Sequence, residues 1–245
     1  MRISYFDFLR SVAILMVVFI HCFGFCYTSS DISIPVIIVR NLMNVAVPLF
    51  FAISGYFLAS KQMENGGYVQ FLKRQIPRVY IPVLFCSLFF LFGDLSSVFS
   101  LKPFIKFFSC GYSVYYFIAV IIQCYLLLWF LKKHVSLFSL KVLIFLGLIW
   151  WSIIHYLLGI YMGRTVPLIL YAGNFVPWGL FFVEGLYFGS RKNATESLKL
   201  SVIVGLSIVL FVLSVVESYF IMEKTQTLQG LGQKASIFCF NAFLC

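Results

Sequence analysis

The sequence predicts an all-α membrane protein, a polytopic helical bundle of seven spans with the beginning of an eighth. Three observations predict this fold class. Of the 245 residues, 62% are hydrophobic and only 11% are charged, and the mean hydropathy is +1.01. Soluble domains of this length do not carry so much apolar sequence. We therefore expect one transmembrane domain over residues 1–245, embedded in the lipid bilayer.

Apolar runs of sufficient length mark the spans, which we expect at about 8–28, 35–60, 79–99, 112–131, 140–161, 167–189 and 200–220. Lys61 to Arg78 is expected as a polar, basic loop. Leu101 to Cys110 is expected as a short amphipathic segment at the membrane interface. Ala235 to Cys245 has the composition of a span, but eleven residues are too few to cross the bilayer. We therefore expect the chain to be truncated at its C-terminus.

The net charge of +10 is carried mostly by the loops. With the N-terminus in the cytoplasm, most of the loop Lys and Arg residues lie on the cytoplasmic side, which is the arrangement that the positive-inside rule favours. In a membrane protein this charge sets the topology, and we expect no nucleic-acid partner. The seven Cys are scattered, mostly within apolar runs and without metal-ligand spacing, so we expect no metal site.

The first apolar stretch, Asp7 to Tyr27, carries Asp7, Arg10 and His21. Arg10 and His21 are eleven residues apart, which is about 16 Å of helix axis and about 20° more than three full turns. Both side chains therefore share one face of the expected helix, and Asp7 lies near the same stripe. One helix is thus expected to hold a cation at the cytoplasmic edge of the membrane and an imidazole deeper in it.

Other ionisable residues lie within the expected spans, where they are costly and usually face the interior of the bundle. Glu184 is the deepest of them, and Arg40 opens the second span. Two interpretations of Glu184 remain open: it pairs with a cation such as Arg40 or His21, or it caps a helix packing contact. Asp94, His155 and Glu217 lie near outer span ends, where water or the aromatic belt accounts for them.

A second basic cluster, Arg74 and Arg78 with the adjacent Lys73, precedes the third span. Arg74 and Arg78 share a face if this segment is helical, although Pro77 also permits a bend. One interpretation is an ordinary cytoplasmic anchor. The other is a site for a phosphate-bearing ligand, because Arg matches the geometry of phosphate with paired donors.

Three features occur in order: Arg10 and His21 with ten residues between them, VPLFFAISGYFL at 47–58, and Arg74-xxx-Arg78 followed by the third span. Together they resemble the acyltransferase-3 family of bacterial integral-membrane O-acyltransferases, which modify sugars of lipopolysaccharide O-antigen, peptidoglycan, exopolysaccharides and Nod factors. The resemblance is collinear over residues 5–90 and weaker through 115–128 and the end of the sixth span.

This resemblance implies a multi-pass acyltransferase of the bacterial inner membrane. Its donor is cytosolic acyl-CoA, most often acetyl-CoA, which acts as a substrate and not as a bound cofactor. By similarity, the donor phosphates lie near Arg10, Arg74 and Arg78, and the acyl group reaches His21. The imidazole then acts as a general base or as a covalent acyl carrier. The acceptor is a hydroxyl of an envelope or exported glycan, free or lipid-linked, and Glu184, Arg40 and Asp7 are candidate supporting residues.

Two other classes of function remain open on the sequence alone. The first is a proton-coupled transporter or flippase of a glycan or lipid, in which His21 and Glu184 form a proton relay. Against it, the sequence has no repeated halves. The second is an inactive, truncated remnant, which the short C-terminal segment supports.

Overall fold

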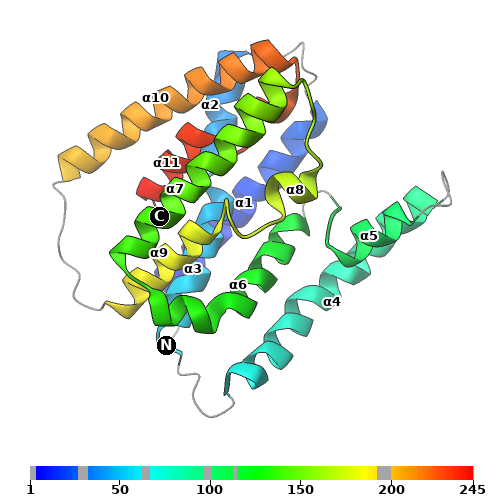
Figure 1. Ribbon diagram of the computed structural model, residues 1–245, viewed down its shortest axis with the longest axis vertical. Coiled ribbons are helices and arrows are strands. Elements are labelled where there is room, and N and C mark those ends of the chain that lie inside the picture. The colour runs from blue at the N-terminus through cyan, green and yellow to red at the C-terminus, as the bar shows by residue number, and fades with distance from the viewer. Residues whose placement is uncertain are drawn as a thin grey trace. The chain divides into compact units, whose positions relative to one another are not determined.

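The computed structural model describes residues 4–26, 33–61, 67–95, 101–112, 115–191 and 200–244 (Figure 1). Every regular element in these ranges is a helix, which confirms the all-α class. Six helices in the described ranges are long and apolar enough to cross a membrane: Tyr5–Cys22, Ile34–Ala59, Gly67–Asp94, Tyr116–His134, Leu137–Tyr161 and Ser201–Thr225.

The chain folds into two compact units. The first contains Met1–Ser60, Val135–Thr165 and Val176–Cys245, and the second contains Lys61–His134 and Val166–Phe175. The α-helices of the first unit are α1 (Ser4–Cys26), α2 (Ile34–Met43), α3 (Ala46–Ala59), α7 (Leu137–Ser152), α9 (Gly179–Ser190), α10 (Leu200–Thr225) and α11 (Ala235–Leu244). A π-helix, Ile153–Tyr161, continues α7, and a short 3₁₀-helix, Leu228–Leu231, precedes α11.

Within the first unit, α3 and α9 lie side by side (Figure 1). Glycine permits this approach. A Cβ at Gly55 of α3 would overlap the carbonyl oxygen of Phe182, and a Cβ at Gly185 of α9 would overlap that of Ala52. Small residues at such crossings let helix backbones pack closely in membrane proteins. This crossing fixes the position of Glu184 on α9, directly before Gly185.

The expected sixth span, 167–189, is not a continuous helix. A short helix, α8 (Leu168–Ala172), belongs to the second unit, and the segment before α9 is non-helical. Pro177 explains the break, because proline lacks an N–H donor and disfavours the helical conformation at the preceding Val176. In place of one span, the sequence forms two shorter helices.

The second unit is built from α4 (Gly67–Leu95), α5 (Lys102–Phe108), α6 (Tyr116–His134) and α8. The expected loop over 61–78 is wrong for most of its length, because α4 begins at Gly67 and continues through Pro77 and Pro82. Both prolines are accommodated within a single helix of 29 residues.

Aromatic contacts hold the N-terminal part of α4 against α6. The hydroxyl of Tyr68 donates a hydrogen bond to the carbonyl of Leu126 at 2.6 Å. The ring of Phe71 packs edge-on against that of Tyr125, with 5.3 Å between the ring centroids. Tertiary packing of this kind stabilises a helix that local signals alone predict to be a loop.

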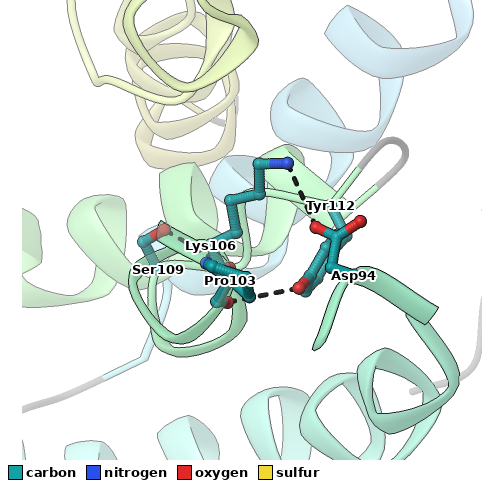
Figure 2. A network of polar contacts seen from close by, with 5 residues as sticks. All are labelled: Asp94, Pro103, Lys106, Ser109 and Tyr112. Carbon is teal, nitrogen blue, oxygen red and sulfur yellow. Dashed lines mark hydrogen bonds and ion pairs between the residues drawn. The ribbon is translucent and has the colours of Figure 1, made fainter. Parts of the chain in front are cut away.

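The segment 101–110 contains a short helix, α5, and its location at the membrane interface stays a prediction. Figure 2 shows the contact that joins it to the end of α4: the ammonium of Lys106 lies 3.2 Å from the carboxylate of Asp94. Within the segment itself, the Tyr112 hydroxyl donates to the carbonyl of Pro103 at 3.2 Å. The Lys106 ammonium also lies 5.7 Å from the centroid of the Tyr112 ring. The ion pair of Asp94 with Lys106 therefore links α4 to α5.

Candidate functional site

Arg10 is held at the beginning of α1 by two contacts within the first unit. Its guanidinium lies 3.9 Å from the carboxylate of Asp7, one turn earlier. It also stacks over the ring of Phe57 on α3, 4.8 Å from the ring centroid. Because both side chains of the Asp7–Arg10 pair are partly exposed, the pair orients Arg10 without removing it from solvent.

His21 lies eleven residues further along the same continuous helix, as predicted. Its side chain is partly exposed, and it interacts electrostatically with Arg40 on α2. The structure therefore brings the predicted catalytic imidazole and one predicted supporting cation into one environment. A partly exposed imidazole is accessible to a reacting group, which a general base requires.

Glu184 is buried, with 7% of its surface exposed. Its Oε2 atom has no hydrogen-bond partner among the described residues. No ion pair joins it to Arg40 or His21 in the described part of the chain. Of the two interpretations of Glu184, pairing with one of these cations is thus not seen, and its position beside the α3–α9 glycine crossing agrees with a packing role.

A pocket of about 350 Å³ lies along α4 in the second unit. Its lining consists of Lys61, Gly67, Gln70, Phe71, Arg74, Gln75 and Arg78. Arg74 and Arg78 reach the same pocket because α4 is helical here, so residues four apart share a face. The adjacent Lys73 does not line the pocket, so the expected three-residue cluster divides between two faces of the helix.

The pocket is strongly positive. Among the described lining residues, Lys61, Arg74 and Arg78 are cations and none is acidic. The amides of Gln70 and Gln75 add neutral donors and acceptors. This combination suits an anion with several oxygen atoms, and phosphate in particular.

A buried polar network in the first unit was missed by the sequence analysis. Lys234, fully buried before α11, donates a hydrogen bond to Oδ1 of Asn41 at 3.1 Å. The Asn41 amide nitrogen lies 3.2 Å from the hydroxyl of Ser214 and 3.1 Å from that of Ser218. The network thus joins α2, α10 and the segment before α11. Burial lowers the pKa of Lys234 to about 7.

The same network continues to the π-helix. The amide of Gln233 donates to the backbone carbonyl of Asn44 at 2.9 Å, and Nε2 of His155 lies 2.7 Å from the carbonyl of Gln233. His155 is buried, with 1% exposed, so its expected place in an aromatic belt is wrong. The asparagines at 41 and 44, three residues apart in an apolar span, are the sequence signal that could have indicated this network.

The site residues divide between the two units. The first holds Asp7, Arg10, His21, Arg40 and Glu184, and the second holds Arg74 and Arg78. In the described ranges, no group of three or more His, Cys, Asp or Glu side chains is arranged to hold a metal ion.

Comparison with known proteins supplies an independent identification. A family described as an acyltransferase domain, acyltransferase-3, matches residues 3–245, which is nearly the whole chain. Neither the curated proteins nor the solved structures yield a match. The apolar helices and the family match together indicate a multi-pass membrane enzyme that transfers acyl groups. The chain belongs to the acyltransferase-3 family.

Proposed function

We propose that this membrane acyltransferase moves an acyl group, most often acetyl, from cytosolic acyl-CoA to a hydroxyl of an envelope or exported glycan. The bacterial inner membrane is the proposed location. The observation that carries the proposal is the pocket on α4, which Arg74 and Arg78 line together. Such a pocket suits the phosphates of a CoA thioester. The contact of Arg10 with the donor stays a prediction.

His21 is the proposed catalytic residue. As a general base, its neutral imidazole takes the proton of the acceptor hydroxyl while the hydroxyl oxygen attacks the thioester carbonyl. The carbon–sulfur bond breaks, the ester forms, and the CoA thiolate leaves and is protonated. In the alternative route, an imidazole nitrogen attacks the thioester first, and the acyl-imidazole then passes its acyl group to the hydroxyl.

The experiment that tests this proposal uses purified protein, radiolabelled acetyl-CoA and a total extract of envelope glycans. The wild type is expected to place base-labile label on glycan. His21→Ala is expected to lower the rate by about 10²–10⁴-fold, the usual contribution of a general base. His134→Ala, a change of the same kind at an exposed position, is the matched control. Label that appears equally with His21→Ala would contradict the catalytic role of His21.

A second measurement separates the two routes. Without acceptor, a covalent carrier accumulates label on the protein at His21, whereas a general base does not. Peptide mapping distinguishes His21 from the adjacent Cys22, which is an alternative site of acylation. Label on His21 would support the carrier route, and its absence in a protein that transfers acetyl to glycan would support the base.

A further inference from the structure

The pocket on α4 contains a third cation, Lys61, that the paired-arginine pattern does not include. The Lys61 ammonium lies over the ring of Phe71, 4.4 Å from the ring centroid. Phe71 is 3% exposed and is itself packed against Tyr125 of α6. The ammonium is therefore placed at the pocket by a fixed aromatic surface, through a cation–π contact.

The backbone of Lys61 is fixed from the other side. The ammonium of Lys132, near the end of α6, donates a hydrogen bond to the Lys61 carbonyl. Tyr68 on α4 hydrogen-bonds to the same helix, at Leu126. Lys61 thus belongs to a packed corner of the second unit, and its side chain is positioned before any ligand binds.

The three cations line one pocket, and the residues that position them follow one another along α4. Phe71, which carries Lys61 above its ring, is followed three residues later by Arg74 and four residues after that by Arg78. Along a helix these steps correspond to about 4.5 Å and about 6 Å. Three cations that line one pocket suit a ligand that carries more than one phosphate group.

We propose that Lys61 is a further donor-binding residue, which contacts the 3′-phosphate of the CoA ribose while Arg74 and Arg78 contact the diphosphate. This assignment rests on the proposed function. The two phosphates of the diphosphate are adjacent, as Arg74 and Arg78 are on their helix face. The 3′-phosphate lies on the ribose, at one side of the diphosphate, and Lys61 lies at one end of the order of cations, beside Phe71.

The assignment also defines the class of donor. A free CoA thioester carries all three phosphate groups, whereas phosphopantetheine attached to a carrier protein carries one. A pocket lined by three cations therefore favours the CoA thioester. Discrimination between acetyl-CoA and 3′-dephospho-acetyl-CoA is the direct measure of the contact made by Lys61.

The test compares the binding of these two compounds to the full chain in nanodiscs of phosphatidylcholine, a lipid without net charge that does not compete for the pocket. The wild type is expected to bind acetyl-CoA about tenfold more tightly than the dephospho compound, which is the size of one charge-assisted hydrogen bond. Lys61→Met is expected to remove this preference and to leave the affinity for the dephospho compound unchanged. Lys61→Arg keeps the charge and is expected to retain the preference.

Lys73→Met is the matched control, because Lys73 lies on α4 but outside the pocket lining. It is expected to keep the wild-type preference. An equal preference in wild type and Lys61→Met, or equal binding of both compounds by wild type, would overturn the role of Lys61 and leave the proposed function intact. Failure of folded wild type to bind either compound would refute the donor site itself, and this inference with it.

Discussion

Arg74 and Arg78 lie four residues apart on one continuous helix and line the same pocket. The relationship depends on α4 remaining helical through Pro77, which lies between them. A bend at this proline would have turned the two guanidinium groups away from each other. The continuous helix brings both to one face of α4, which makes them available to a single anionic ligand.

The α3–α9 crossing predicts a severe effect of one added methyl group. Gly185→Ala is expected to destabilise the protein by at least about 1–3 kcal/mol, because the Cβ would overlap the backbone of Ala52 and the helices would have to separate. Thermal unfolding in detergent measures the change.

Gly205→Ala on α10 is the control for this substitution. Nothing lies within 4 Å of a Cβ at Gly205. Since alanine has a higher helix propensity than glycine, by up to about 1 kcal/mol, this variant is expected to be as stable as the wild type or more so. Equal stability of Gly185→Ala and Gly205→Ala would contradict the close crossing.

Lys234 predicts a pH dependence of stability. Burial, which outweighs the nearby Glu217 carboxylate, lowers the pKa of Lys234 to about 7 from its ordinary value of 10.5. Between these pH values the unfolded chain binds one more proton at this residue than the folded chain, so the contribution of Lys234 to stability rises with pH. The temperature of unfolding, measured from pH 7 to pH 10, is expected to show this rise.

Lys234→Met is expected to lose this component of the pH dependence. Lys224→Met, at an exposed position on the last turn of α10, is expected to keep it. Stability profiles of the wild type and Lys234→Met that run parallel over the whole pH range would contradict a pKa of Lys234 lowered by burial.

Helices that consist of one uninterrupted apolar run were predictable from the sequence. The first span, the fifth span and the seventh correspond to α1, to α7 with its π-helix, and to α10. Proline was an ambiguous signal. Pro177 breaks the sixth expected span, whereas Pro77 and Pro82 lie inside α4. The difference at the start of α4 arises from the packing of Tyr68 and Phe71 against α6, which involves residues far away in the chain.

The candidate site was predictable where its residues lie on one helix. The shared helix of Arg10 and His21 follows from spacing alone. The spacing of Arg74 and Arg78 fits one helix face, but that their segment is helical was not predicted. Lys61 and Lys234 could not be found in this way. Lys61 is placed at the pocket by its contact with the Phe71 ring. Lys234 donates its hydrogen bond to Asn41, which is 193 residues earlier in the chain. Long-range contacts of this kind leave no local pattern.

Cys110 predicts a low thiol reactivity. It is buried after α5, and burial raises its pKa to about 11. Because the thiolate is the reactive form, alkylation by iodoacetamide at pH 8 is expected to be slow in the folded protein and fast after unfolding in detergent. Mass spectrometry of the peptide that contains Cys110 measures both rates. Equal rates in the folded and unfolded protein would contradict the burial of this thiol.

The pocket on α4 is proposed to bind the donor, and the most direct test is the binding of acetyl-CoA to purified protein. Wild type is expected to bind saturably. Arg74→Ala/Arg78→Ala is expected to bind at least about a hundredfold more weakly, since two charge-assisted contacts are lost. Unchanged affinity in this double variant, or no binding by folded wild type, would contradict the account.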